Sequence, residues 1–409
     1  KATGEAIIRA VIRIEELPSI GVLSNEYGFY AIALPKGKYT LIVSQLGYEK
    51  YKEQIQLDSN LNLTIFLKSA NTLKEVVVES GRKNDNLLKP QMGTETLDMK
   101  TINKVPVIFG EKDILKTLQL LPGVKSAGEG NSGFYVRGGS ADQNLILLDE
   151  APVYNASHLL GFFSTFNSDA IKDVTLIKGN TPAQYGGRLS SILDIYQKEG
   201  NKNDFHMNGG IGLISSRILA EGPIVKDKGS FVVAGRASYA HLFLKLVDNP
   251  NLAYFYDLNT KLSYSLNEKN NIYLSGYFGR DVFQLNDSFV NTYGNSVLNF
   301  RWNHLFSDKL FSNLSMIYSD YYYGLKLDII GFNWDSGIKN YNVKYDFKHY
   351  ISDKFKLTYG IQSHYYDFNP GKIEPTRPDS GINADQLDKK YALENSIYID
   401  AEHQITKNL

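Results

Sequence analysis

The segment Asp169–Tyr196 reads DAIKDVTLIKGNTPAQYGGRLSSILDIY and is the most informative stretch of the chain for its fold. Two runs of β-branched and aliphatic residues, Ile171–Ile177 and Leu193–Tyr196, lie on either side of a glycine-rich, polar stretch. Runs of this kind bounded by turn residues are typical of strands. The segment therefore predicts two strands separated by a glycine-rich turn.

The residues before this segment extend it into a mixed domain. Asp113–Leu121 has apolar residues at 114, 115, 118 and 121, a spacing that predicts a helix, and Pro122-Gly123 ends it. Two further strands are expected at Phe134–Val136 and Asn144–Leu148. Residues 91–199 are therefore predicted to form a compact α+β domain.

The part that follows, residues 200–409, is predicted to be an array of β-hairpins. The chain has 28 tyrosines, most of them in this part, and strands such as Phe355–His364 alternate apolar and polar residues. Aromatic enrichment with alternation is typical of outer-membrane barrels, although a half-buried strand of a soluble sandwich also alternates. Short polar turns recur at Leu266–Asn271, Phe306–Leu310, Ile351–Phe355 and Ile405–Leu409. Longer loops are expected between them, at Val247–Leu252, Leu285–Gly294, Ile329–Gly337 and Asn369–Asp388.

About nine strands are expected in this array, too few to close around a separate domain. An open sheet edge cannot lie in lipid, because its backbone groups stay unpaired. The array is therefore interpreted as part of a transmembrane antiparallel barrel. The chain is expected to continue past Leu409 and, because it opens at Lys1 without Met, to be trimmed at its start as well.

The first 70 residues predict a small β-sandwich. Strands are expected at Ala10–Ile14, Gly28–Leu34, Lys38–Gln45, Lys52–Leu57 and Leu61–Leu67, with turn residues between them. Residues 71–90 form a linker that contains the β-prone segment NTLKEVVVES at Asn71–Ser80.

Composition narrows the function classes. Apolar residues make up 43% of the 409 residues and no run approaches the length of a spanning helix, which argues against both a disordered chain and a helical membrane protein. Lysine and arginine number 44, as do aspartate and glutamate, so no nucleic-acid partner is expected. Cysteine is absent, which removes disulfides, thiolate metal sites and cysteine nucleophiles.

The middle domain resembles the plug of TonB-dependent outer-membrane receptors. The matching segments are Asp113–Gly123, Phe134–Gly139, Asn144–Asn155, Asp169–Gly179 and Pro182–Arg188 with the LSSILDI that follows. The first 70 residues are similar to the carboxypeptidase-regulatory-type sandwich that precedes the plug in many Bacteroidetes receptors, including SusC-like ones. The resemblance implies a barrel of roughly 22 strands, closed by the plug, in the outer membrane of a Gram-negative bacterium.

The resemblance also implies specific residue roles. Leu73, Glu75, Val76, Val77 and Val78 are similar to a TonB box, which TonB would capture as an added strand; the alternative is the last strand of the sandwich. Arg137 and Arg188 each lie beside a glycine pair and are expected to anchor the plug to acidic residues of the barrel wall. The alternative for these arginines is an ion pair within the plug.

Ligand contact is expected in the apolar and aromatic stretch Tyr154–Phe166, with plug core as the alternative. The Tyr321-Tyr322-Tyr323 run fits either an interface girdle or a stacking platform. Gly128–Gly133 fits G-x-G-x-x-G, but a helix precedes it and a strand follows, so it is interpreted as a loop. The candidate ligand contacts are Tyr154, Asn155, His158, Phe162 and Phe163.

No catalytic constellation, metal site or cofactor motif is found, so the protein is not expected to be an enzyme. The favoured function is TonB-dependent import of a bulky nutrient such as a siderophore, glycan or peptide. The alternatives are a non-transporting docking subunit of an outer-membrane complex and a soluble β-rich binding protein. The partners that the resemblance implies are TonB with ExbB–ExbD, the lipid bilayer and, in many relatives, a SusD-like lipoprotein or other outer-membrane proteins.

Overall fold

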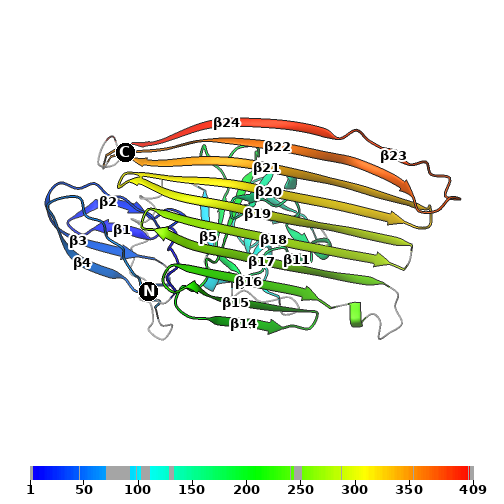
Figure 1. Cartoon of the computed structure of the whole chain (residues 1–409), viewed down its shortest axis with the longest axis horizontal. Helices are drawn as coiled ribbons and strands as arrows, with labels where there is room; N and C mark the ends of the chain where they lie inside the picture. The colour runs from blue at the N-terminus through cyan, green and yellow to red at the C-terminus, as the bar shows by residue number, and fades with distance from the viewer. Residues whose placement is uncertain are drawn as a thin grey trace.

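The structure, a computed structural model, consists of an N-terminal domain, a middle domain and one large antiparallel sheet (Figure 1). No helix in the described residues is both long and apolar enough to cross a membrane. The structure describes residues 3–45, 47–70, 93–97, 99–102, 111–128, 133–239, 241–243, 251–286, 288–352, 354–403 and 405.

The N-terminal domain has a four-stranded sheet in the order β2-β1-β3-β4. Its strands are β1 (Val11–Ile14), β2 (Leu17–Leu23), β3 (Gly37–Ser44) and β4 (Tyr51–Leu57). The expected strands at Gly28–Leu34 and Leu61–Leu67 are wrong, and β2 lies partly where a turn was expected. Neither Gly28–Leu34 nor Leu61–Leu67 pairs with a neighbouring strand over its length, but each packs every second side chain on the core of the domain. Their alternation therefore reflects burial rather than strand pairing.

The middle domain is built on a five-stranded sheet in the order β5-β12-β13-β8-β9. Strand β13 pairs with β8 in parallel and with β12 in antiparallel fashion, so the segment Asp169–Tyr196 provides two adjacent interior strands of the sheet. Its elements are β5 (Thr94–Leu97), α2 (Met99–Ile102), α3 (Ile114–Leu118), β6 (Val124–Ser126), β7 (Phe134–Val136), η1 (Ala141–Gln143), β8 (Asn144–Leu148), β9 (Ala151–Pro152), β10 (Ser157–His158), η2 (Leu159–Gly161), β11 (Phe163–Ser164), β12 (Ile171–Ile177) and β13 (Ser191–Gln197).

The large sheet has eleven strands in the described residues, nearly all paired with their neighbours in the sequence. The expected number, about nine, is therefore slightly low. The strands are β14 (His206–Ile211), β15 (Ser215–Val225), β16 (Gly229–Ser238), β17 (Leu252–Asn267), β18 (Asn270–Leu285), β19 (Phe289–Ser307), β20 (Leu310–Leu327), β21 (Phe332–Tyr350), β22 (Phe355–Pro375), β23 (Asp385–Gln386) and β24 (Lys390–His403).

Several strands of this sheet are longer than the alternation predicted. Strand β22 has 21 residues, and β19 and β21 have 19 each, against about ten for a strand that crosses a bilayer. The ladders continue through most of two segments expected to be loops, 285–294 and 329–337. The long loops are therefore shorter than expected, because the hairpins remain paired almost to their tips.

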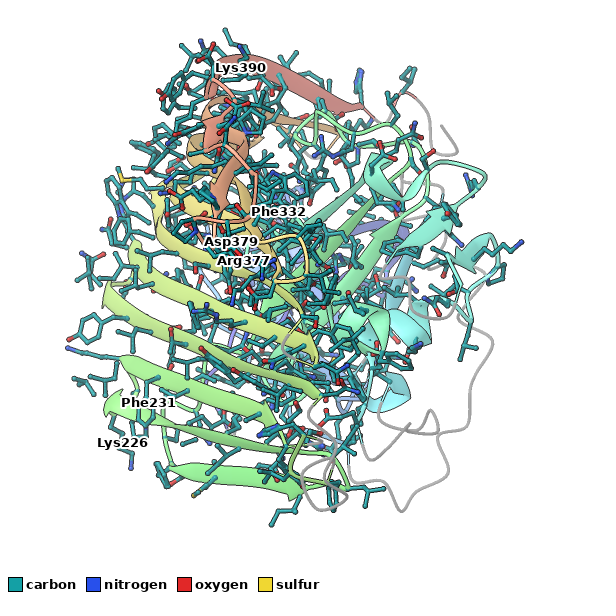
Figure 2. All side chains as sticks on the ribbon, turned by 90° about the vertical axis from the view of Figure 1, so that its right-hand side faces the viewer. Lys226, Phe231, Phe332, Arg377, Asp379 and Lys390 are labelled. Carbon is teal, nitrogen blue, oxygen red and sulfur yellow. The ribbon has the colours of Figure 1, made fainter. Side chains whose placement is uncertain are left out.

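The large sheet curves around the middle domain. Viewed from the end opposite the N-terminal domain, the sheet forms an arc with the middle domain against its concave face (Figure 2). The N-terminal domain lies at the end of the sheet where the short turns are (Figure 1). Along β17, the inward side chains Asp257, Asn259 and Lys261 are buried, whereas the outward Leu258 and Leu262 are exposed. Along this strand the concave face is therefore polar and the outer face apolar.

Candidate functional site

The middle domain meets the sheet through the tip of its β8–β9 hairpin. The two residues of the turn, Asp149 and Glu150, both have positive φ (49° and 72°). Two such residues form the type I′ geometry that suits a two-residue hairpin loop, and aspartate tolerates it better than most residues. The turn carries two adjacent carboxylates into the concave face of the sheet.

Asp149 is held by two cations of the sheet. Its Oδ1 lies 3.0 Å from Lys261 Nζ and 3.6 Å from the Arg301 guanidinium, and all three side chains are almost completely buried. Gln197 donates two further hydrogen bonds to it. Burial alone would raise the pKa of Asp149, but Lys261 and Arg301 lower it below the ordinary value. Asp149 is therefore a charged anchor inside the interface.

Glu150 connects all three parts of the molecule. Its carboxylate accepts hydrogen bonds from Tyr27 of the N-terminal domain (2.6 Å), and from Ser315 (2.5 Å) and Asn313 (3.1 Å) of β20. Arg301 Nη1 lies 3.9 Å away. Burial would raise the pKa of Glu150, but Lys344 and Arg301 lower it. This carboxylate is thus shared between the N-terminal domain and the sheet.

His158 forms a second anchor between the middle domain and the sheet. Its Nδ1 lies 2.6 Å from Asp281 and its Nε2 lies 3.1 Å from Asp257, and its ring stacks on Phe255 at 4.3 Å. Burial would lower the pKa of His158, but Asp281 and Asp257 raise it above its ordinary value. Both ring nitrogens face carboxylates, so the geometry fits an imidazolium that donates from each.

Two further ion pairs cross this interface. Arg236 of β16 lies 3.6 Å from Glu111, and Arg217 of β15 lies 2.7 Å from Asp169. Apart from His158, the charged groups of the middle domain in these contacts are carboxylates and those of the sheet are lysine or arginine. The expectation had been the reverse, with plug arginines on wall acids.

A cavity of about 530 Å³ lies between the middle domain and the later strands of the sheet. Three side chains of β22, His364, Tyr366 and Phe368, line it as a row of stacked rings 5.5 Å apart. Amide and charged side chains share the wall with them. The lining includes Tyr154, Gln184 and Arg188 of the middle domain, Asn340, Asn342 and Lys344 of β21, Glu394 of β24, and Glu26 and Tyr27 of the N-terminal domain.

The two predicted anchoring arginines lie elsewhere. Arg137 is exposed, and its guanidinium lies beside Gly93 and Gly179. Arg188 is exposed at the cavity and donates to the Gly187 carbonyl at 2.8 Å. Among the described residues, neither guanidinium is within 4.0 Å of a carboxylate. Their anchoring role stays a prediction.

The predicted ligand contacts fall into two groups. His158 and Phe163 are buried, with 2% and 3% of their surface exposed, and contact the sheet. Asn155 also contacts the sheet, since its carbonyl accepts from Asn295 at 2.7 Å. Phe162 is 53% exposed and Tyr154 lines the cavity. Ligand contact remains a prediction for all five, of which Phe162 is exposed and Tyr154 and Asn155 are half-buried.

The Tyr321-Tyr322-Tyr323 run divides between the two faces of the sheet. Tyr321 lies on the concave side, 6.5 Å from Tyr154, whereas Tyr322 lies under the Arg280 guanidinium. Alternation along a strand requires this division. A single stacking platform of three rings is therefore wrong.

Sequence reasoning missed the interface residues Asp149, Glu150, Lys261 and Arg301. The available signal was an acidic pair directly after the buried run Asn144–Leu148, in a turn two residues long. Leu73, Glu75, Val76, Val77 and Val78 lie outside the described residues. Within the described part of the chain, no group of three or more histidine or acidic side chains is arranged to hold a metal ion.

Two domain families match the chain. Residues 1–78 match the CarboxypepD_reg-like domain, and residues 93–191 match the TonB-dependent receptor plug domain. The first match includes Leu73–Val78, the segment for which the sequence left two interpretations. No curated protein matches the chain in sequence.

Solved structures with the same fold include a siderophore receptor and an outer-membrane transporter. The siderophore receptor PirA of Pseudomonas aeruginosa superposes with a TM-score of 0.56 at 15% identity, over 78% of this chain and 54% of that one. FpvA of P. aeruginosa, bound to pyoverdines, superposes with a TM-score of 0.57 at 13% identity, over 78% of this chain and 50% of that one. The outer-membrane transporter YddB of Escherichia coli superposes with a TM-score of 0.53 at 11% identity, over 76% of this chain and 54% of that one. The chain spans about half the length of these structures.

Proposed function

We propose that this chain, which carries a TonB-dependent receptor plug domain behind a CarboxypepD_reg-like domain, is part of an outer-membrane transporter that TonB drives. The observation that carries the proposal is the plug domain seated on the concave, polar face of the large sheet. The sheet is then one part of the barrel wall, with its apolar outer face toward lipid. In the proposal, the N-terminal domain faces the periplasm, and residues 71–92 lie between it and the plug in the sequence.

The chemistry of the interface suits a plug that moves. Its polar contacts include the ion pair of Asp149 with Lys261 and the hydrogen bond from Ser315 to Glu150. The apolar contacts beside them in the described part of the chain are limited to a few wall residues such as Val297 and Ile317. Water can replace each polar partner when the surfaces separate, and a buried ion pair adds little net stability over its hydrated parts. An apolar interface of the same extent would instead oppose separation. The plug is thus held in register without being bound irreversibly.

The cargo in this proposal is a bulky nutrient such as a siderophore, a glycan or a peptide. Siderophore receptors are among the structures with the same fold. Cargo would first meet Phe162, which is exposed, and then Tyr154 at the cavity. The cavity wall combines ring faces with amide groups, which can bind either apolar or hydroxyl-bearing parts of a ligand.

The partner that supplies energy is TonB with ExbB–ExbD. In the proposal, TonB pairs with Leu73–Val78 as an added strand, in which main-chain hydrogen bonds supply the affinity. A SusD-like surface lipoprotein is a further proposed partner on the outer side. Force applied to the captured segment Leu73–Val78 would then reach the plug, because only 14 residues, from Glu79 to Met92, separate the two in the sequence.

The test is a pull-down of the full-length protein in detergent by the periplasmic domain of TonB. Val77→Pro removes a backbone N–H and should abolish binding. Val77→Ala, the matched control, trims the side chain but keeps the N–H, and should retain most of it. Equal binding by the proline and alanine variants would contradict strand capture at this segment.

The alternative is a plugged barrel that acts as a docking subunit without transport. Absence of binding by the wild type, even with outer-membrane extract added as a source of cargo, would favour it. The next measurement would then be the set of outer-membrane proteins that co-purify with the full-length chain.

A further inference from the structure

A tight turn of the N-terminal domain, residues Ser24–Tyr30, reaches into the interface between plug and wall. We call it the wedge loop. The Asn25 side chain accepts hydrogen bonds from the backbone N–H groups of Tyr27 and Phe29, both at 2.9 Å, and Gly28 has a φ of +78° that suits glycine. These local bonds fix the loop, so that Glu26 and Tyr27 project from it.

The wedge loop is bound to the wall by charge and by stacking. Glu26 lies 2.5 Å from Lys348 of β21, and both side chains are mostly buried. Burial would raise the pKa of Glu26, but Lys348 lowers it to about 2. The Tyr27 and Phe29 rings both stack on Phe311 of β20, with centroids 5.4 and 5.5 Å away. The wedge loop is therefore bound to the large sheet by both an ion pair and aromatic stacking.

The same loop holds the plug hairpin. The Tyr27 hydroxyl donates to Glu150 at 2.6 Å, and Arg301 lies 5.4 Å above the Tyr27 ring. Glu150 also accepts from Ser315 of the wall, so one carboxylate joins loop, plug and wall. Glu26 and Tyr27 also line the cavity, on the side of the N-terminal domain.

A second contact fixes the N-terminal domain to the plug. Arg9 pairs with Asp173 of β12 at 2.6 Å. In the chain, the segment that TonB is proposed to capture lies between the two domains that these contacts join. A force applied to that segment is therefore transmitted along the chain to the N-terminal domain in one direction and to the plug in the other.

We propose that the N-terminal domain is a latch on the plug: the wedge loop holds the Asp149-Glu150 hairpin on the wall and closes the cavity, and it must leave before the hairpin can move. This inference concerns regulation of the transporter and rests on the proposed function. The latch needs no further ligand, because its contacts are all within the chain. Its removal exposes Glu150 and the periplasmic side of the cavity together.

The first test measures hydrogen exchange of the plug hairpin in the full-length protein. The Glu26→Gln/Tyr27→Phe variant removes the ion pair and the hydroxyl but keeps both side-chain shapes. Exchange over residues 144–152 should rise at least tenfold. The matched control, Lys52→Gln/Tyr39→Phe, removes an ion pair to Glu15 and a hydroxyl bond to Pro35 within the N-terminal domain but outside the wedge loop, and should leave that exchange unchanged.

The second test pulls on the protein through bound TonB periplasmic domain in a single-molecule instrument. The 409 residues contain no cysteine, so Glu26→Cys/Lys348→Cys introduces one pair for a reducible bismaleimide cross-linker. The cross-linked protein should bind TonB normally but show no extension of the plug until the linker is reduced. The Glu26→Gln/Tyr27→Phe variant should extend at least ten times faster than the wild type at the same force.

The outcomes separate the two proposals. Failure of TonB to bind the wild type contradicts the proposed function, whereas the exchange test still decides the latch. Normal binding with equal plug extension in cross-linked and reduced protein overturns the latch alone. Equal hairpin exchange in the latch variant and its matched control would also overturn it.

Discussion

One of the buried carboxyl groups of the plug, that of Asp194, is expected to make the stability of the domain depend on pH. Tyr185 donates to its Oδ2 at 2.8 Å, whereas its Oδ1 has no hydrogen-bond partner among the described residues. Burial raises its pKa from 3.8 to about 7, despite the Tyr185 hydrogen bond. The folded state therefore favours the neutral acid. This contribution is greatest below pH 3.8 and is lost as the pH rises toward 7.

Asp194→Asn should accordingly stabilise the plug at alkaline pH. At pH 8 the variant avoids a buried charge, and we expect a gain of about 1–4 kcal/mol in the free energy of unfolding. At pH 5 the gain should be smaller. Thermal unfolding at both pH values measures the difference, with Asp142→Asn, at an exposed position in η1, as the control. An equal gain at pH 5 and pH 8 would show that charge is not the cause.

His158 is a second residue whose charge matters. Its imidazolium faces Asp281 and Asp257, so His158→Gln leaves two buried carboxylates without this positive charge beside them. We expect the free energy of unfolding to fall by about 3–5 kcal/mol. Because its pKa is raised, the wild-type contribution is complete below pH 6.5 and is lost as the pH rises through the folded-state pKa. Denaturant unfolding from pH 6 to pH 9 measures this, with the exposed His206→Gln as control. A pH-independent loss would contradict the imidazolium.

At the scale of elements, the β8–β9 hairpin is the plug's main anchor. Asp149→Asn removes the carboxylate that Lys261 and Arg301 share. It should lower the free energy of unfolding of the plug by about 3–5 kcal/mol, as the loss of one partner of a buried ion pair does. Lys261→Met on the same background should cost much less than it does alone. A double-mutant cycle on plug unfolding should give a coupling of about 1–3 kcal/mol. Additive effects would mean that the 3.0 Å contact carries no net interaction.

The sequence predicted elements wherever local pattern and pairing agree. Ile171–Ile177 is β12 as expected, because a buried run bounded by glycine has few other solutions. Gly28–Leu34 failed, because its alternation comes from packing on the core without a paired neighbour. Asp149 and Glu150 were missed, because their partners lie more than 100 residues away and no local pattern indicates a cation across an interface. The site was therefore far less predictable than the fold.

At the scale of the whole molecule, two ion pairs hold the N-terminal domain, one to the plug and one to the wall, beside the contacts of Tyr27 and Phe29. Arg9 pairs with Asp173, and Glu26 pairs with Lys348. When one contact breaks, the other keeps the domain close, so that the first re-forms as an intramolecular event at high effective concentration. Loss of either contact alone should therefore leave the domain seated.

Arg9→Gln and Lys348→Met should thus be strongly non-additive. We expect each single variant to raise backbone exchange over residues 25–29 by less than threefold, and the double variant to raise it by well over tenfold, because only the double variant loses both ion pairs. Exchange measured by mass spectrometry on full-length protein decides the question. Lys52→Gln, which breaks an exposed pair inside the N-terminal domain, is the control and should change nothing. If the double variant shows only the product of the single effects, the two contacts act independently and the domain does not clamp plug and wall as one body.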